Sequence, residues 1–100
     1  MKAPSLVQFS QMLRVLAHPV RLRVVELLLD GERDVSAIGQ ALGLEGPAVS
    51  QHLSLLRAHR LVDQRRVGQR AFYRLSSDGL GRWLMAGSRL STAEPLAFDA

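Results

Sequence analysis

The sequence predicts a mainly α-helical domain that carries a single β-hairpin, and three observations support this fold class. Hydrophobic residues recur with the period of an α-helix over most of the chain. Between residues 61 and 75 the period shortens to two, which is typical of strands. The chain has 100 residues, 47% of them hydrophobic, which is enough for one domain with its own core.

Two helices are expected at the amino-terminal end. The first spans residues 6–16, where hydrophobic side chains form one stripe and Ser5 can cap the helix. The residue before a proline is disfavoured in a helix, so this helix should end before Pro19. Pro19 can open the second helix, which is largely hydrophobic over residues 20–29, and Asp30-Gly31 ends it.

A pair of short helices joined by a turn should follow. Asp34 is placed to cap the third helix, whose hydrophobic positions are 35, 38 and 42, and Gly43 ends it. Pro47 suits the first turn of the fourth helix, which holds the stretch VSQHLSLL. Two short helices joined by a glycine-containing turn predict a helix-turn-helix.

The fourth helix has an exposed face of short polar side chains. Its buried stripe consists of Val49, Leu53 and Leu56. The opposite face carries Ser50, Gln51 and Ser54, without a Lys or Glu among them. Serine and glutamine can reach base edges in the major groove with directional hydrogen bonds, whereas long cations would seek phosphates. This face therefore predicts a helix that reads DNA.

A hairpin and a last helix complete the domain. Strands are expected within 61–67 and 70–75, joined by a turn at Gly68-Gln69. The stretch Ser76-Ser77-Asp78 can cap a helix with hydrophobic positions 80, 83, 84 and 85. Helix, helix, helix-turn-helix, hairpin, helix (α-α-α-α-β-β-α) is the order of a winged helix-turn-helix. We expect this domain to span residues 1–90, with residues 91–100 as a frayed tail.

Charge and composition point to a nucleic-acid partner. The net charge is +4, and between Arg57 and Arg74 lie six arginines and one acid, Asp63. Such a cluster favours phosphate, although a solvated face with ordinary ion pairs is the alternative. The chain has no cysteine, which excludes disulfides and thiolate metal sites. No hydrophobic run approaches the roughly 18 residues of a membrane span and no signal peptide opens the chain, so we expect a cytoplasmic protein with no membrane partner.

The predicted interface with double-stranded DNA combines the fourth helix with the hairpin, or wing. The helix would contact base edges, and the wing would contact the backbone or an adjacent minor groove. The candidate DNA-binding residues are Pro47, Ala48, Ser50, Gln51, His52, Ser54, Arg57, Arg65, Arg66, Gln69 and Arg70.

Three segments of the chain resemble the ArsR/SmtB family of bacterial dimeric transcriptional repressors. They are LAHPVRLRVVELLLDGE, ALGLEGPAVSQHLSLLR and LVDQRRVGQRAFYRL, and together they cover about Leu16 to Leu75. The resemblance implies a homodimer built from the first and last helices, which binds an inverted-repeat operator and releases it when an inducer arrives. The residues that fall at this implied interface are Leu6, Phe9, Met12, Leu13, Leu80, Trp83 and Leu84. The alternative for each is packing within one chain.

The chain departs from the metal-sensing members of that family. Asp34 and Ser36 stand where those members carry a Cys-x-Cys, and no histidine follows His59 to form a site on the last helix. Thiolate and paired-histidine metal sites are therefore not expected, and we predict no metal and no cofactor. An unknown small-molecule inducer, a hard metal held by acids and His18, a partner protein and no inducer at all remain open.

Local departures concern the histidines and the ends of the fourth helix. We expect His18 to be structural or a helix cap, His52 to contact DNA or pack between helices, and His59 to be inert. Glu45 replaces a good capping residue before the fourth helix. Arg60 replaces the helix-ending glycine usual in the family, so it must adopt another geometry or the left-handed region.

Two other classes of function compete with a DNA-binding regulator. A winged helix could bind another protein through its hydrophobic helices without specific DNA binding, but the arginine cluster argues against this module. An enzyme has the least support, because the sequence shows no catalytic triad, paired carboxylates, phosphate loop or metal cluster.

Overall fold

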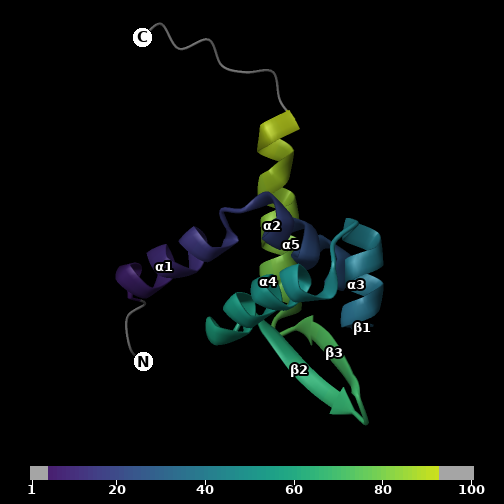
Figure 1. The fold of residues 1–100 in the computed structure, drawn as a ribbon. Helices are drawn as coiled ribbons and strands as arrows, with labels where there is room; N and C mark the ends of the chain where they lie inside the picture. The colour runs from purple at the N-terminus through teal and green to yellow at the C-terminus, as the bar shows by residue number, and fades with distance from the viewer. Residues whose placement is uncertain (1–4, 93–100) are drawn as a thin grey trace, which may run out of the picture.

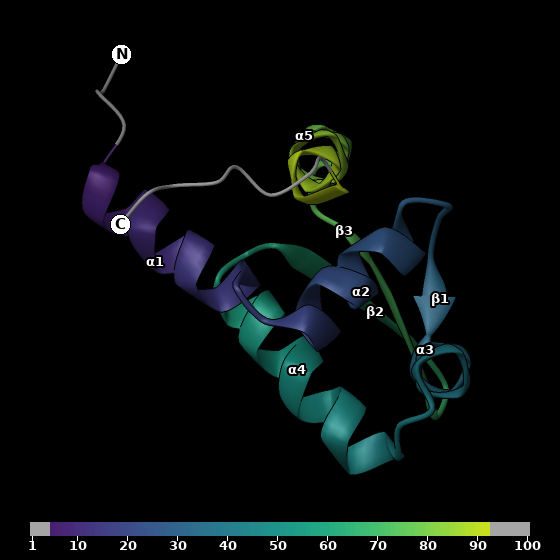
Figure 2. The same cartoon turned by 90° about the horizontal axis from the view of Figure 1, so that it is seen from above.

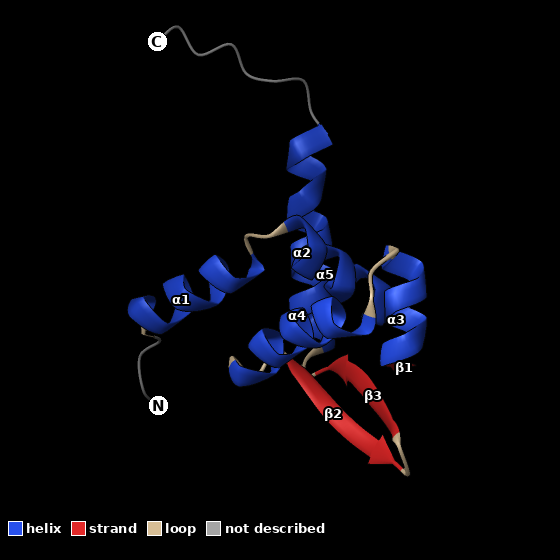
Figure 3. Cartoon of the chain, viewed as in Figure 1, coloured by secondary structure: helices blue, strands red, loops and turns tan. Residues whose placement is uncertain are grey.

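The computed structural model describes residues 5–92 and confirms the predicted order of helices and hairpin (Figure 1). The elements are α1 Leu6–Leu16, α2 Pro19–Leu28, β1 Arg33–Asp34, α3 Val35–Leu42, α4 Gly46–Ala58, β2 Val62–Val67, β3 Arg70–Leu75, α5 Asp78–Ser88 and the 3-10 helix η1 Arg89–Thr92. The hairpin of β2 and β3 extends below the helices (Figure 3).

Side-chain caps set the starts of α1, α2 and α3. The predicted cap of α5 is wrong, because Ser77 stands at its N-cap but makes no side-chain capping hydrogen bond. Ser5 Oγ accepts a hydrogen bond from the Gln8 backbone N–H at 3.2 Å, and Asp34 Oδ1 accepts one from Ala37 at 2.8 Å. His18 caps α2 through Nδ1, which accepts from the Val20 N–H at 3.1 Å. These bonds satisfy backbone donors that have no partner inside a helix.

The sheet has one strand more than the sequence predicts. The two-residue β1 pairs antiparallel with β3, so the strand order is β1-β3-β2. Arg33 lies opposite Tyr73 and Asp34 opposite Phe72. A two-residue strand is too short to show a period of two, so sequence patterning could not reveal it.

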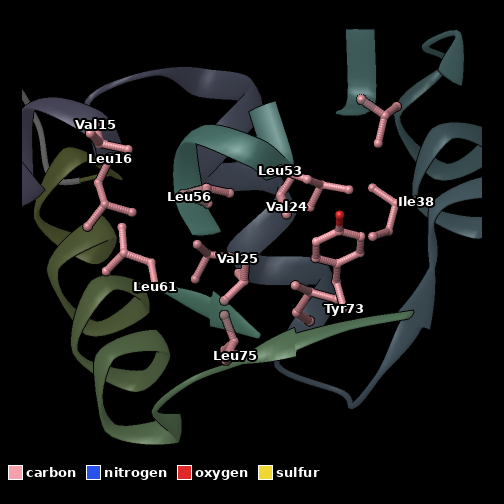
Figure 4. Close-up of a cluster of buried hydrophobic side chains, with 13 residues drawn as sticks. Val15, Leu16, Val24, Val25, Ile38, Leu53, Leu56, Leu61, Tyr73 and Leu75 are labelled. Carbon is pink, nitrogen blue, oxygen red and sulfur yellow. The ribbon is translucent and has the colours of Figure 1, made fainter. Parts of the chain in front are cut away.

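The core lies between α2, α3, α4 and the inner face of the sheet (Figure 4). Its fully buried side chains include Val24, Val25, Ile38, Leu53 and Leu56. Leu61 is also buried, although it precedes β2 rather than belonging to it. Because α4 contributes its hydrophobic stripe to this core, its polar stripe must face outward.

Helices α1 and α5 project from this body in two directions (Figures 1 and 2). Only the last two residues of α1, Val15 and Leu16, are buried, and in α5 only Gly81 is. A Cβ at Gly81 would lie 2.4 Å from Leu29 Cδ2, so α5 crosses the body in close contact at this glycine. The rest of both helices is left largely uncovered within one chain.

The carboxyl-terminal boundary differs slightly from the expected one. Helical structure continues to Thr92 as η1, two residues into the segment expected to be a frayed tail. Ser91 Oγ donates to the Ser88 carbonyl at 2.6 Å, which supports this turn. The rest of that segment, residues 93–100, and the first four residues of the domain expected over 1–90 lie outside the described residues.

Candidate nucleic-acid interface

The exposed stripe of α4 consists of the predicted short polar side chains. Ser50, Gln51, Ser54 and Arg57 are exposed, while the hydrophobic stripe of the same helix is buried. Pro47 is exposed at the first turn, and the adjacent Ala48 is half-buried. The helix therefore presents hydrogen-bonding groups at its surface from its second turn to its last.

The structure brings this helix and the wing together around one polar hollow of about 250 Å³. Ser50 lines it from α4, and Arg66, Gln69 and Arg70 line it from the hairpin. Asp34, at the start of α3, is among the other residues that line it. Four of the predicted DNA-binding residues thus share a single surface, although they lie up to 20 positions apart in the sequence.

His52 lies apart from that surface and packs inside the domain. It is half-buried, and its ring lies against that of His18 with centroids 4.8 Å apart. Its Nδ1 is 3.4 Å from Nη1 of Arg21. Burial, followed by the charges of His18 and Arg21, lowers the pKa of His52. Of the two roles expected for His52, the geometry matches helix packing.

Two wing arginines are ion-paired within the molecule. Arg65 binds Glu32 through Nε at 3.1 Å and Nη2 at 2.5 Å, and Arg70 binds Asp34 Oδ2 through Nε at 3.1 Å. Both guanidinium groups also lie about 5 Å from the ring of Phe72, at 5.0 and 4.9 Å. The arginines therefore flank one aromatic ring, and each has an acid as counter-charge.

The ion pairs shift the acids toward their charged forms. The hydrogen bond from Arg65 lowers the pKa of Glu32, and Glu32 in turn raises the pKa of Arg65. Asp34 has a lowered pKa because it accepts hydrogen bonds from Arg70 and from the Ala37 backbone. Sequence reasoning missed this role of Glu32 and of Asp34. The alternating charges of Glu32-Arg33-Asp34 were the one signal in the sequence. They could not be assigned to partners on the hairpin without knowing that β1 pairs with β3.

The remaining arginines of the cluster form weaker ion pairs or none within the described part of the chain. Arg74 is 3.6 Å from Asp63. Among residues 5–92, the side chains of Arg57, Arg60 and Arg66 have no acid within ion-pair distance. These three carry the positive charge available to an external anion.

Both expected departures at the ends of α4 are confirmed. Glu45 stands at the N-cap and makes no side-chain capping hydrogen bond. Arg60 has φ of 59°, so it adopts the left-handed region rather than an alternative helix exit.

Four of the seven predicted dimer residues are exposed and form a hydrophobic surface on α1 and α5. Leu6 is 78% exposed, Trp83 51% and Phe9 41%, and the rings of Phe9 and Trp83 lie 6.0 Å apart. Leu13 is also exposed, whereas Met12, Leu80 and Leu84 are half-buried against the core. Beside this surface runs a mainly hydrophobic groove of about 860 Å³ between α2 and α5, lined in part by Leu22, Trp83 and Leu90.

In residues 5–92 no three His, Asp or Glu side chains gather closely enough to hold an ion. Within the same range, none of the helices is both long and hydrophobic enough to cross a membrane.

Known proteins resemble this chain in both sequence and fold. The family described as "Bacterial regulatory protein, arsR family" matches residues 18–64. The biofilm growth-associated repressor of Xylella fastidiosa is 39% identical over 69 residues, which are 69% of this chain and 60% of that protein. The chain thus spans less than two thirds of that relative.

Solved structures match over more of the chain. The transcriptional repressor BigR from Xylella fastidiosa has 34% identity and a TM-score of 0.75, over 82% of this chain and 84% of that one. The homodimeric winged helix-turn-helix DNA-binding domain Mb0332 of Mycobacterium bovis has 28% identity and a TM-score of 0.79, over 100% and 98% of the two chains.

Proposed function

The chain belongs to the ArsR family of bacterial regulatory proteins, and on that premise we propose that it is a homodimeric transcriptional repressor that binds an inverted-repeat operator. Its partners would be double-stranded DNA and a second copy of itself, in the cytoplasm. The domain responsible would be residues 1–90.

One observation carries this proposal: the short polar stripe of α4 borders the same hollow as the wing. Ser50, Gln51 and Ser54 are exposed on a helix narrow enough for the major groove. Arg66 and Gln69 line the same hollow as Ser50, where a backbone phosphate next to that groove would approach. Base reading and phosphate anchoring are thus assigned to neighbouring but separate side chains.

The ion-paired wing arginines would contribute differently. Arg65 and Arg70 must exchange Glu32 and Asp34 for phosphate oxygens before they can contact DNA. Each exchange would form an arginine–phosphate contact. It would also leave a carboxylate without its arginine close to the negatively charged DNA, which offsets part of the gain in affinity. We therefore assign the larger share of wing affinity to Arg66, and a smaller share to Arg65 and Arg70.

The exposed hydrophobic residues of α1 and α5 support a dimer. Leu6, Phe9 and Trp83 are large, exposed hydrophobic side chains, and the rings of Phe9 and Trp83 lie 6.0 Å apart, so the two helices offer hydrophobic surface to a partner. The Mb0332 domain, which this chain matches over its full length, is described as homodimeric. A two-fold dimer presents two copies of α4, and this symmetry calls for an operator with two inverted half-sites.

Any inducer that releases the operator, such as a small molecule, would be something other than a metal at the family's Cys or His positions. The chain has no cysteine. Asp34, at one of the thiolate positions, uses Oδ1 to cap α3 and Oδ2 to bind Arg70. A carboxylate engaged in this way is a poor metal ligand, and we propose no cofactor.

The proposal can be tested by fluorescence anisotropy on the DNA upstream of the protein's own coding sequence and on a scrambled duplex, over a salt series. A preference of about 10³ or more for the upstream fragment, with affinity falling steeply as salt rises, is expected. Equal binding to both duplexes would contradict a specific operator. No binding to either at low salt would contradict DNA binding and favour a protein-interaction module.

A further inference from the structure

The end of α4 uses a backbone conformation that suits glycine better than the arginine it holds. Arg60 donates its N–H to the Arg57 carbonyl at 2.9 Å, and Leu61 donates to Leu56 at 2.9 Å. This is the hydrogen-bond pattern of a Schellman motif, in which the residue after the C-cap is left-handed. Among residues 5–92, Arg60 is the only non-glycine with positive φ.

The end of α3 provides an internal comparison. Gly43 donates to Gln40 at 3.4 Å, and Leu44 donates to Gly39 at 3.0 Å, in the same pattern. Gly43 has φ of 67°, close to the 59° of Arg60. Glycine adopts this region without steric cost, whereas a residue with a Cβ is strained there. The way the helix ends therefore explains why residue 60 has a positive φ. It does not explain why this residue is an arginine rather than a glycine.

The Arg60 side chain lies at a polar hollow that is separate from the one beside the wing tip. This hollow of about 630 Å³ is lined by Arg57, Arg60, Val62, Asp63, Gln64 and Ser76. Asp63 is its one acid, and its carboxylate is already engaged by Arg74 at 3.6 Å and by the Ser76 hydroxyl at 3.0 Å. Arg57 and Arg60 therefore supply two uncompensated positive charges.

This hollow continues the candidate DNA surface. Ser50, Ser54 and Arg57 stand at i, i+4 and i+7 of α4, so Arg57 extends the reading stripe by about 10 Å from Ser50. Gln64 lines both this hollow and the one beside the wing tip. A duplex seated on the stripe would thus bring its backbone to Arg57 and Arg60.

We propose that Arg60, together with Arg57, binds a phosphate of the DNA backbone at the carboxyl-terminal end of α4. The proposal rests on the proposed function, and it adds a contact at the end of the helix far from the wing tip. Two planar guanidinium groups can share the oxygens of one phosphate, with Gln64 and Ser76 as neutral neighbours. The strained backbone at Arg60 is then explained by ligand binding.

Three variants of one residue separate charge from backbone strain. Arg60→Gly removes both, Arg60→Gln keeps the strain without the charge, and Arg60→Lys keeps both. Duplex affinity over a salt series and the thermal unfolding midpoint should be measured for each. Arg82→Gln, which removes an exposed arginine from α5, is the matched control for net charge.

If Arg60 binds phosphate, the DNA affinity of the variants should depend on whether residue 60 carries a positive charge. Arg60→Gly and Arg60→Gln should lose about one unit of salt slope per protomer, and on the order of 50-fold in dimer affinity at 0.1 M salt. Arg60→Lys and the control should keep the slope. Arg60→Gly alone should gain stability, with a midpoint raised by about 4–8 °C.

Two results would overturn the proposal. Wild-type slope and affinity in Arg60→Gly and Arg60→Gln, with specific binding by the wild-type protein, would show that Arg60 makes no contact. A loss confined to Arg60→Gly would show that the backbone matters rather than the charge. If the wild-type protein binds no duplex at all, the proposed function itself fails, and the experiment identifies that case separately.

Discussion

The imidazole rings of His18 and His52 lie against each other, with their centroids 4.8 Å apart and their planes tilted by 56°. The contact joins the corner between α1 and α2 to the helix proposed to read DNA. Nδ1 of His18 accepts the Val20 N–H, and Nδ1 of His52 faces Arg21. A protonated Nδ1 cannot accept a hydrogen bond, so the contact of His52 with Arg21 requires a neutral His52 ring.

We expect the fold to lose stability as the pH falls below about 6.5. Burial lowers the pKa of His52 from its ordinary value of 6.5, so below that pH the unfolded chain binds the proton more readily than the folded one. The stabilisation is complete above the unfolded pKa and is lost as the pH falls toward the folded one. Thermal unfolding between pH 8 and pH 5 measures it.

Two histidine variants locate this pH dependence. His52→Gln should flatten the dependence between pH 7.5 and 5.5, whereas His59→Gln, at an exposed site, should not. An unchanged profile in His52→Gln would rule out His52 as the titrating group.

Asp34 should stabilise the fold as a cap and restrain the wing as an ion pair. Asp34→Ala removes both functions and should lower the unfolding midpoint by about 4–8 °C. Asp34→Asn keeps a capping oxygen but frees Arg70, so it should keep most of the stability and bind duplex DNA more tightly, with a steeper salt slope. Equal destabilisation of the two variants would mean that the ion pair, rather than the cap, stabilises the fold.

Gln51→Ala should relax the choice of operator. The side chain is exposed on the α4 stripe and contributes little to the core, so the unfolding midpoint should not change. Loss of one base contact should reduce the preference for the operator over a scrambled duplex by about 1–3 kcal/mol. Anisotropy on both duplexes measures the ratio. Full retention of the preference would show that the reading face is placed wrongly.

Arg66→Ala should weaken binding to every duplex by a similar factor. Arg66 has no acid within ion-pair distance among the described residues, so its whole charge is available to phosphate. The salt slope should fall by about one unit per protomer. Arg65→Ala is the matched control on the same strand, and its effect should be smaller because Glu32 already binds that side chain. A larger effect of Arg65→Ala would contradict this ranking.

Trp83→Ala should convert the dimer into monomers that remain folded. Trp83 is half exposed and touches Phe9, so its loss removes surface from the proposed interface rather than from the core. Analytical ultracentrifugation measures the assembly state, and circular dichroism checks the fold. Val67→Ala is the control, because Val67 is equally exposed but lies on the wing. A dimer that persists in Trp83→Ala would place the interface elsewhere.

The helices and the hairpin could be predicted from the sequence because short-range interactions specify them. The caps at Ser5 and Asp34 act on an N–H three residues away, and Gly43 ends α3 through its own φ. Gly68-Gln69 marks the turn of the hairpin in the same way. Helical periodicity places the polar residues of α4 on one face, so the face proposed to contact bases could also be predicted from the sequence.

The electrostatic state of the site was decided by tertiary structure alone. Arg65 meets Glu32 across 33 positions, and Arg70 meets Asp34 across 36, because β1 pairs with β3. His52 turns inward to His18 because α4 packs against the start of α2. Periodicity reports which face of an element is buried, but it carries no information on which distant element covers that face. The chain by itself therefore determined which residues could meet DNA, and packing decided which of their charges remain free to do so.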